Sequence, residues 1–121
     1  MKARGLIIAA PHSGAGKTTV TLALLAALRR RGLVVRAAKA GPDYIDPAFH
    51  AAATGSVSVN LDSWAMSSTL LDALAAQAAD GADIVVIEGV MGLFDGAADA
   101  GAHGRHGATA DLAAHFGLPT P

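Results

Sequence analysis

Apolar and polar positions divide the chain into short apolar runs and longer stretches with helical spacing. The apolar runs cover residues 6–10, 33–38 and 84–87, and the last is a continuous β-branched run typical of a strand buried on both faces. Four stretches have a helical pattern: residues 17–30, 46–55, 67–79 and 109–116. Strands that alternate with helices predict an α/β fold, a parallel sheet flanked by helices with right-handed crossovers.

Two stretches between these elements are predicted to be loops. Residues 39–45 contain the Gly-Pro pair that typically ends a strand in a loop. Asp46 followed by Pro47 then predicts a helix N-cap with proline at the first helical position. Residues 95–107 are small and glycine-rich, which predicts a mobile loop.

The first apolar run passes into a glycine-bearing turn that ends in Gly-Lys-Thr and opens the first helix. This order of strand, loop and helix is the context that a phosphate-binding P-loop requires. Gly14 and Gly16 can adopt the positive φ values that aim backbone N–H groups at one anion, and the helix N-terminus adds further donors. Lys17 would reach the β- and γ-phosphates, while the Thr18 hydroxyl would ligate Mg²⁺. The predicted nucleotide-binding residues are Ser13, Gly14, Ala15, Gly16, Lys17, Thr18 and Thr19.

One position departs from the general P-loop pattern. Pro11 stands where the pattern begins with glycine. A φ fixed near about −65° can still open such a turn, but the match is weaker for it. The alternative is an ordinary strand, turn and helix with chance glycines.

Composition narrows the function classes. A chain of 121 residues makes one domain, and its formal net charge of −1 predicts neither a nucleic-acid partner nor an anionic membrane surface. No apolar run approaches the ~18 residues of a membrane span. The chain has no cysteine, which excludes a disulfide framework, a thiolate metal site and a cysteine nucleophile within it. A cytoplasmic location is therefore expected.

Polar residues follow the predicted strands where parallel α/β sheets bind ligands, at the carboxyl ends. Lys17 follows the first strand, Lys39 and Asp43 follow the second, and Glu88 follows the run 84–87. Because Glu88 comes after four apolar residues and precedes glycine, its side chain is expected to emerge at the phosphate rim. Directly or through water, it would be a Mg²⁺ partner of Thr18. The alternative is a strand that merely ends at a polar residue.

Three motifs carry a resemblance to a known family. They are Lys39-Ala-Gly-Pro-Asp-Tyr-Ile-Asp-Pro-Ala-Phe-His50, Asn60-Leu-Asp62 and Glu88-Gly-Val-Met-Gly-Leu-Phe-Asp-Gly96. In these motifs the chain resembles the cobyrinate or hydrogenobyrinate a,c-diamide synthases of cobalamin biosynthesis, and the first leans toward the hydrogenobyrinate branch. The resemblance implies a P-loop NTPase-type fold similar to dethiobiotin synthetase. The family's form of the P-loop also accommodates a residue such as Pro11 at its start. One departure is Gly107-Ala-Thr109, where the family usually has Gly-Ser-Thr.

The resemblance implies ATP and Mg²⁺ as cofactors and a corrinoid substrate. ATP would phosphorylate an acetate side chain, and ammonia derived from glutamine would displace the phosphate to form an amide. Lys17, Asp43 and Asp95 are the predicted catalytic residues, and Thr18, Asp43 and Glu88 the predicted metal site. Lys39 and Tyr44 are the predicted substrate-binding residues.

Two of the residues in these motifs have plainer alternatives. Tyr44 could pack against its own turn instead of orienting the substrate. Asp46 is expected to cap its helix rather than to take part in catalysis.

The histidines are more consistent with solvated side chains than with a metal site. His103 and His106 lie three apart in a glycine-rich loop, and His12, His50 and His115 are scattered. Without further ligands nearby, such a pair is more often solvated than metal-bound.

The chain is expected to be the N-terminal part of a longer protein. After Gly117-Leu-Pro119 this topology should enter another buried strand, and the cysteine-dependent glutaminase domain of the resembled family would lie beyond residue 121. A separate small subunit and a homodimer both stay open.

Three rival functions also stay open. One is another amidoligase or ligase of the same fold, such as cobyric acid synthase or dethiobiotin synthetase. Another is a partitioning-type switch ATPase, although those carry a lysine where this chain has His12. The last is a folded piece that binds nothing.

Overall fold

The computed structural model describes residues 4–11, 16–43 and 45–120. The described strands are β1 (Arg4–Ile8), β2 (Val35–Ala40), β3 (Val59–Leu61) and β4 (Ile84–Glu88). The described helices are α1 (Lys17–Arg30), α2 (Asp46–Thr54), α3 (Ser68–Ala79) and α4 (Thr109–Phe116).

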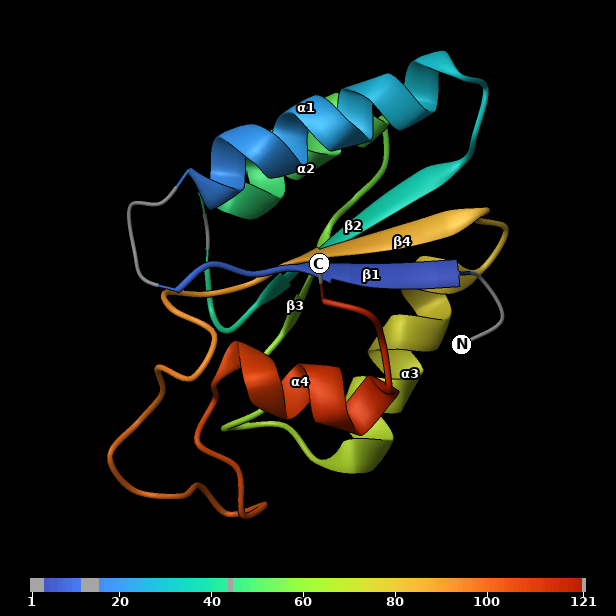
Figure 1. The fold of residues 1–121 in the computed structure, drawn as a ribbon. Helices are drawn as coiled ribbons and strands as arrows, with labels where there is room; N and C mark the ends of the chain where they lie inside the picture. The colour runs from blue at the N-terminus through green and yellow to red at the C-terminus, as the bar shows by residue number, and fades with distance from the viewer. Residues whose placement is uncertain (1–3, 12–15, 44, 121) are drawn as a thin grey trace.

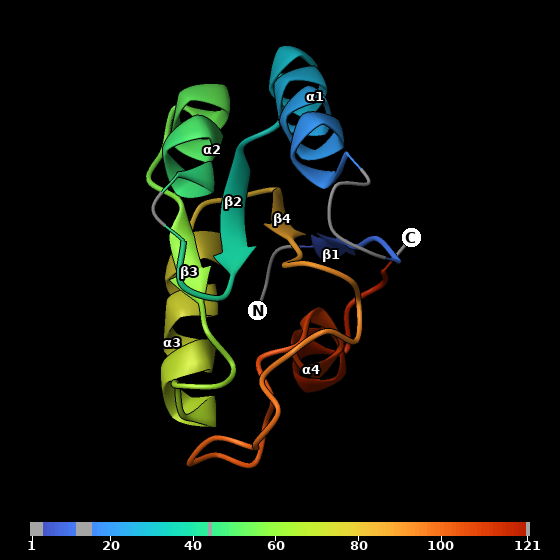
Figure 2. The ribbon, with the colours of Figure 1, turned by 90° about the vertical axis from the view of Figure 1, so that its left-hand side faces the viewer.

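The four described strands form one parallel sheet in the order β1-β4-β2-β3. Helices α1 and α2 cover one face of this sheet, and α3 and α4 cover the other (Figure 1; Figure 2). The α/β fold with a helix-flanked parallel sheet is thus confirmed. Because β4 lies between β1 and β2, the carboxyl end of β4 is central to the edge where ligands bind.

Each face of the sheet has its own apolar core. On the α1 side, Leu25 is fully buried with Val35 and Val86. On the other side, Leu71 of α3 and Leu112 of α4 are buried with residues of the sheet. The central strands therefore have apolar contacts on both faces, as the β-branched run of β4 predicted.

Strand β2 begins and ends two residues later than the predicted run 33–38. Gly32 has φ +84, and Leu33 N–H donates to the Leu28 carbonyl, so the turn that ends α1 still holds Leu33. Pairing with β4 starts at Val35, opposite Ile84. The prediction that Lys39 follows the strand was wrong, because Lys39 pairs with Glu88 inside the sheet.

Two other strands are also defined by their pairing in the sheet. Strand β1 spans Arg4–Ile8 rather than 6–10, because its pairing with β4 runs from Arg4 to Ile8. Strand β3 was not predicted. It has only three residues, and pairing with Ala38–Ala40 of β2 defines it.

Helix α2 starts next to the predicted position but with a different cap. Ile45 is the N-cap residue, and Oδ1 of Asp43 accepts hydrogen bonds from the backbone N–H groups of Ile45 and Asp46. The prediction that Asp46 caps the helix was wrong. The predicted end at Gly55 is confirmed, since Gly55 is the C-cap residue with φ +77.

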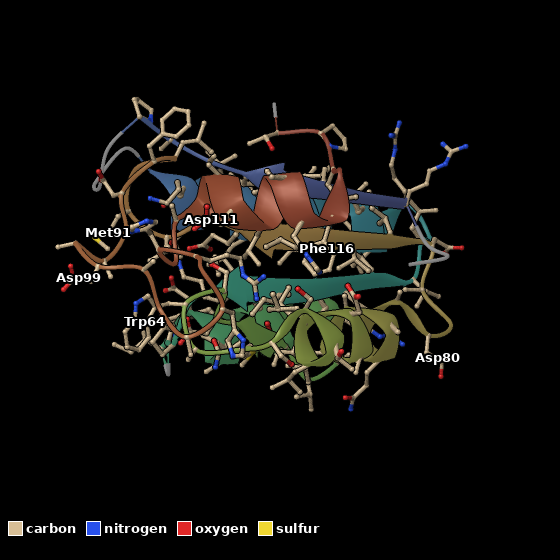
Figure 3. All side chains as sticks on the ribbon, turned by 90° about the horizontal axis from the view of Figure 1, so that it is seen from below. Trp64, Asp80, Met91, Asp99, Asp111 and Phe116 are labelled. Carbon is tan, nitrogen blue, oxygen red and sulfur yellow. The ribbon has the colours of Figure 1, made fainter. Side chains whose placement is uncertain are left out.

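The expected loop 95–107 contains no helix or strand, but it is attached to the rest of the molecule. Arg105 donates from Nε to the Ser63 carbonyl at 2.9 Å and from one terminal nitrogen to the Met66 carbonyl at 2.6 Å. Trp64 Nε1 donates to the Asp99 carbonyl at 3.2 Å. Figure 3 shows Trp64, Met91 and Asp99 together at the end of the molecule opposite Asp80. The loop predicted to be mobile is therefore anchored to the segment before α3.

None of the helices among the described residues combines the length and apolar character needed to cross a membrane.

Candidate functional site

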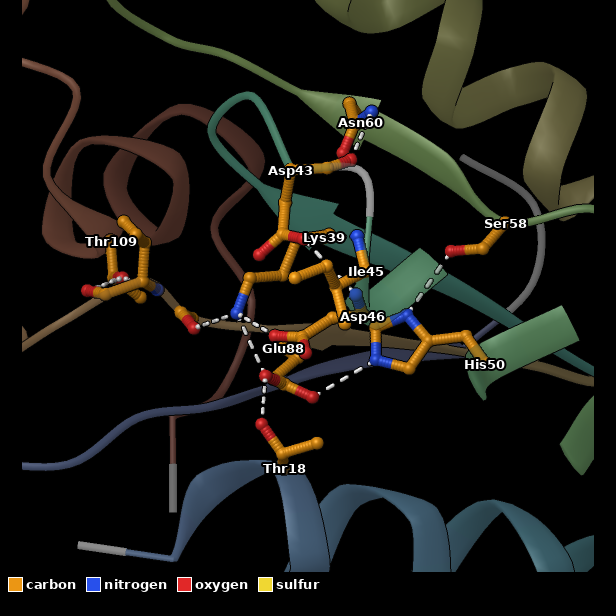
Figure 4. A network of polar contacts seen from close by, with 12 residues as sticks. Thr18, Lys39, Asp43, Ile45, Asp46, His50, Ser58, Asn60, Glu88 and Thr109 are labelled. Atoms are coloured by element: carbon orange, nitrogen blue, oxygen red, sulfur yellow. Dashed lines mark hydrogen bonds and ion pairs between the residues drawn. The ribbon is translucent and has the colours of Figure 1, made fainter. Parts of the chain in front are cut away.

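The centre of the candidate site is Glu88, the last residue of β4, whose side chain is completely buried. Side chains from α1, β2 and α2 converge on its carboxylate (Figure 4). Thr18 Oγ1 donates to Oε2 at 2.9 Å, Lys39 Nζ donates to the same oxygen at 2.7 Å, and His50 Nε2 bonds Oε1 at 2.9 Å. We call Thr18, Lys39, Asp46, His50 and Glu88 the Glu88 cluster.

Lys39 is the second hub of the Glu88 cluster and is only 4% exposed. Its ammonium contacts Asp46 Oδ2 at 2.8 Å and donates to the Gly89 carbonyl at 3.0 Å, in addition to its bond with Glu88. A buried ammonium with three acceptors is fully satisfied. Asp46, which the sequence indicated as a cap, instead supplies this lysine with a second carboxylate.

The contacts keep both hubs charged despite their burial. Burial by itself would raise the pKa of the Glu88 carboxyl, but hydrogen bonds from His50 and Lys39 outweigh it and lower this pKa to about 2. Burial would also lower the pKa of the Lys39 ammonium. Its hydrogen bonds to Asp46 and Glu88 have the larger combined effect and raise this pKa above the usual value. At neutral pH the pair is therefore a buried ion pair.

Thr18 links the Glu88 cluster to the N-terminus of α1. Gly16 is the N-cap residue of α1 and has φ +86, a conformation that glycine adopts without strain. Lys17, Thr18 and Thr19 form the first turn of the helix, where backbone N–H groups attract anions. The predicted nucleotide residues Ser13, Gly14 and Ala15 lie outside the described residues.

The donor set around Thr18 fits Mg²⁺. Thr18 and Glu88 supply oxygen atoms, which Mg²⁺ prefers, and Mg²⁺ commonly takes only one or two protein ligands beside phosphates and waters. The Thr18 hydroxyl donates its hydrogen bond to Glu88, so the lone pairs of its oxygen stay free for a cation. Both Glu88 oxygens already have partners, so Glu88 fits as the acceptor behind Thr18 better than as a direct ligand. Among the described residues, no group of three or more histidine, aspartate or glutamate side chains could hold a metal ion.

The expectation that the Glu88 side chain emerges at the rim was wrong, because side chains from α1, β2 and α2 bury its carboxylate. Its carboxylate nevertheless contacts the Thr18 hydroxyl, and its predicted role at a Mg²⁺ site stays a prediction. His50 and Asp46 are cluster members whose part in the site the sequence did not show. They lie four residues apart in the motif Asp46-Pro-Ala-Phe-His50, which places them on one helix face and was the available signal.

Asp43 lies close to the Glu88 cluster but has a role in the backbone turn. Its Oδ1 accepts the N–H groups of Ile45 and Asp46, and its own carbonyl accepts a bond from Asn60 Nδ2 at 3.1 Å. Its predicted catalytic and metal-binding roles stay predictions. Tyr44, the predicted substrate residue, lies outside the described residues.

Asp95 is not a member of the Glu88 cluster. Its Oδ2 accepts the backbone N–H of Gly92 at 2.9 Å. It borders a cavity of about 450 Å³ whose other lining residues are Ala9, Ala10, Pro11, Leu93, Phe94 and Thr120. Its predicted catalytic role stays a prediction.

A second cavity, of about 310 Å³, lies beside the loops that follow β2 and β4. Its lining includes Pro42, Trp64, Val90 and Met91. Met91 has φ +46, an uncommon value for a residue with a side chain. Such backbone strain is concentrated at functional sites.

Two of the histidines have plain partners. His115 Nε2 contacts Asp72 Oδ1 at 2.8 Å on the surface, and His106 Nδ1 contacts the Ala97 carbonyl at 3.0 Å. His12 lies outside the described residues.

Known proteins similar to this chain include a nucleotide binding domain family, which is consistent with the geometry at the N-terminus of α1. Residues 6–99 match the CobQ/CobB/MinD/ParA nucleotide binding domain. The chain is 63% identical to the hydrogenobyrinate a,c-diamide synthase of Mesorhizobium japonicum, over 98% of this chain and 27% of that protein. It is 64% identical to the synthase of that name from Rhodobacter capsulatus, over 96% of this chain and 26% of the relative. It is 60% identical to the synthase of that name from Rhizobium meliloti, over 94% of this chain and 25% of the relative.

The chain thus spans about a quarter of the length of these relatives. The resemblance seen in the three motifs is confirmed by identity over nearly the whole chain. With the match over residues 6–99, these findings show that the chain belongs to the CobQ/CobB/MinD/ParA nucleotide binding domain family and is similar to hydrogenobyrinate a,c-diamide synthases.

Proposed function

We propose that this chain is the nucleotide-binding part of an enzyme that uses ATP to amidate the a- and c-acetate carboxylates of hydrogenobyrinate. The observation that carries the proposal is the bond from Thr18 to a buried, ionised Glu88 at the end of the central strand. It joins a Gly-Lys-Thr sequence at a helix N-terminus to an acidic residue, as nucleotide and Mg²⁺ binding require. The names of the similar proteins support the substrate.

Residues 13–19 would hold the nucleotide phosphates, with the N–H groups of the first turn of α1 as donors. Lys17 would neutralise charge on the β- and γ-phosphates. Mg²⁺, when bound, would neutralise charge on the phosphate oxygens. The Thr18 hydroxyl would ligate this Mg²⁺ ion. Glu88 would orient that hydroxyl by accepting its hydrogen bond.

The acceptor carboxylate would approach from the loop after β2. Asp43 lies in this loop, Lys39 is the second-last residue of the strand, and Gly41 and Pro42 of the loop line the 310 Å³ cavity. Binding cavities of small molecules are commonly about 300–1,000 Å³ and mostly apolar, so this one suits an acetate-bearing edge of a corrinoid. Asp95, which lines the 450 Å³ cavity, would steer the carboxylate or the ammonia.

The proposed reaction has two steps. A carboxylate oxygen attacks the γ-phosphorus, the bond to the β-phosphate oxygen breaks, and ADP leaves. Ammonia then attacks the carbonyl carbon of the acyl phosphate, and phosphate leaves with the former carboxylate oxygen. Positioning and charge neutralisation supply most of the catalysis in phosphoryl transfer.

The ammonia would come from glutamine, hydrolysed by a glutaminase domain in the longer protein. We propose that residues 1–121 are the N-terminal part of the nucleotide- and substrate-binding domain and that the enzyme acts in the cytoplasm. The length of the similar proteins supports the existence of further domains.

Isotope transfer tests this proposal. The full-length protein is supplied with ATP, Mg²⁺, ammonium chloride and hydrogenobyrinate whose carboxylates carry a heavy oxygen isotope. The expected products are the a,c-diamide, ADP and phosphate that carries one heavy oxygen for each amide formed. Lys17→Ala is the control and should form neither amide nor labelled phosphate.

Three outcomes would contradict parts of the proposal. Unlabelled phosphate beside a normal yield of amide would exclude the acyl phosphate. No amide from hydrogenobyrinate would exclude the substrate, and cobyrinate and dethiobiotin precursors in parallel assays would then identify the ligase. ATP hydrolysis that responds only to a protein partner or to DNA would favour a switch ATPase.

A further inference from the structure

His50 is a completely buried polar side chain with no part in the proposed chemistry so far. It lies on α2, and its ring bridges the end of β4 and the segment before β3 (Figure 4). Nε2 bonds Glu88 Oε1 at 2.9 Å, and Nδ1 contacts Ser58 Oγ at 3.2 Å. A buried histidine with partners at both nitrogens has a fixed ring orientation.

The neighbouring groups determine which atom donates in this chain of contacts. Ser58 Oγ lies 3.1 Å from the Ala37 carbonyl oxygen and 3.2 Å from Nδ1, and its one proton can be donated to either acceptor. The ionised Glu88 carboxylate can only accept. Nε2 therefore carries a proton and donates to Oε1, and in the neutral ring Nδ1 then accepts the Ser58 hydroxyl proton, which fixes the ring orientation.

The two oxygens of Glu88 have different partners. Oε2 accepts hydrogen bonds from Lys39 and Thr18, whereas Oε1 accepts one from His50. Removing the Nε2 donor would leave Oε1 buried with an unmet acceptor. The carboxylate would then gain by rotating or shifting towards other donors, and Oε2 would lose its alignment with Thr18.

We infer that His50 is a positioning residue that holds Glu88 Oε1, so that Oε2 stays aligned with the Thr18 hydroxyl at the Mg²⁺ site. The inference rests on the proposed nucleotide and Mg²⁺ site. It adds a partner that orients the ligand-bearing hydroxyl through Glu88. Partners of this kind affect metal affinity by about 10–100-fold in other proteins.

A matched pair of substitutions separates positioning from simple packing. Glutamine can place its amide nitrogen near the position of Nε2, so His50→Gln retains a donor for Glu88. Asparagine is shorter, so His50→Asn retains a polar group on the side of Nδ1 and loses the donor. Both substitutions remove the ring, so a purely structural role would affect them alike.

The measurement is the Mg²⁺ dependence of binding of a non-hydrolysable ATP analogue, followed by calorimetry on the full-length protein. We expect His50→Asn to raise the half-saturating Mg²⁺ concentration by about 10–100-fold and His50→Gln by about threefold or less. Binding of the analogue without Mg²⁺ should be equal in all three proteins. The midpoint of thermal unfolding is recorded for each to separate affinity from stability.

The outcomes distinguish the inference from the proposed function. If the wild-type protein binds the analogue equally with and without Mg²⁺, the proposed site and the inference both fail. If Mg²⁺ strengthens wild-type binding, and the two variants match each other or the wild type, only the positioning role fails.

Should His50→Asn not fold, Ser58→Ala takes its place, because it frees Nδ1 while Nε2 still faces Glu88. We expect Ser58→Ala to raise the half-saturating Mg²⁺ concentration by about threefold, less than the loss of a direct partner. An unchanged Mg²⁺ dependence would overturn the positioning role.

Discussion

At the scale of single residues, the candidate site depends on charges that are buried and mutually satisfied. Lys39 and Glu88 are almost completely buried, and each is surrounded by partners of opposite charge or by hydrogen-bonding groups. Removing one partner from such a buried group commonly costs about 3–5 kcal/mol, because the other charge is left uncompensated. These residues therefore contribute to stability as well as to the proposed chemistry.

The acid sensitivity of the fold is expected to depend on Glu88. Its pKa is lowered from 4.5 to about 2, so its contribution to stability is present above pH 4.5 and is lost as the pH falls through about 2. The free energy of unfolding, measured with urea at several pH values, should fall over this window. Glu88→Gln should make the fall shallower, whereas Asp80→Asn, at an exposed carboxylate at the end of α3, should leave it unchanged. An equal slope in Glu88→Gln would contradict the buried ion pair.

Asp43 can be tested with substitutions that separate its turn from its proposed chemistry. Asn retains an Oδ1 that can accept the N–H groups of Ile45 and Asp46, whereas Ala cannot. We expect Asp43→Asn to keep the stability of α2 and to lower kcat and kcat/KM together by about 100-fold, as for a misplaced reacting group. Steady-state amidation with ammonia, together with ATP binding by calorimetry, provides the measurement.

The Asp43→Ala variant is the matched control and should lose stability as well as activity. If Asp43→Asn amidates normally and only the KM for ATP rises, Asp43 does not act on the acceptor.

At the scale of elements, Arg105 attaches the long connection between β4 and α4 to the chain around the start of α3. Arg105 bonds the Ser63 and Met66 carbonyls between β3 and α3, and the hydroxyl of Ser68, the first residue of α3. Gly101 and Gly107 allow the connection to pass close to Trp64, since a Cβ at Gly101 would lie 2.3 Å from the Trp64 carbonyl oxygen. These contacts hold a glycine-rich segment in a defined path beside the 310 Å³ cavity.

Arg105→Ala is expected to free this connection. Hydrogen bonds that involve a charged group contribute about 1.5–3 kcal/mol each, although shared bonds do not add fully. Residues 96–107 should exchange amide hydrogens faster and be cut sooner by protease, while the sheet keeps its protection. Arg31→Ala, at an exposed position after α1, is the control. Equal exchange rates in the two variants would show that Arg105 does not anchor the connection.

At the scale of the whole molecule, the Glu88 cluster joins elements from distant parts of the chain. Thr18 and Glu88 are 70 positions apart, and His50 and Glu88 are 38 apart. The cluster therefore exists only when α1, α2, β2 and β4 are packed together. Ligand binding at this junction should be linked to the stability of the entire fold.

MgATP is expected to raise the midpoint of thermal unfolding, because a ligand that binds only the folded state stabilises it. At a concentration 100 times Kd the gain is about 2.7 kcal/mol. Lys17→Ala should abolish most of this gain, and ATP with a chelator should give less than MgATP. Near-ultraviolet and far-ultraviolet circular dichroism should report the same shift. If Lys17→Ala is stabilised as strongly as the wild type, the P-loop assignment is wrong.

The sequence by itself determined the fold class, the order of most elements and the family. Helix 17–30 was predicted with its observed bounds, because helix periodicity and glycine stops are local signals. The strand ends were misplaced by two residues at β1 and β2, because pairing with β4 decides where a strand begins. The three-residue β3 was missed for the same reason, since so short a strand carries no periodic pattern of its own.

The partners within the site were decided only by the tertiary structure. The sequence brought Thr18 and Glu88 together through the logic of parallel strands, but it indicated Asp46 as a cap and His50 as one of several scattered histidines. Helix α2 packs against β2 and α1, which brings His50 to the Glu88 carboxylate and Asp46 to the Lys39 ammonium. A buried charge must find its partners among the side chains that the fold places within reach, and spacing along the chain does not determine these distances.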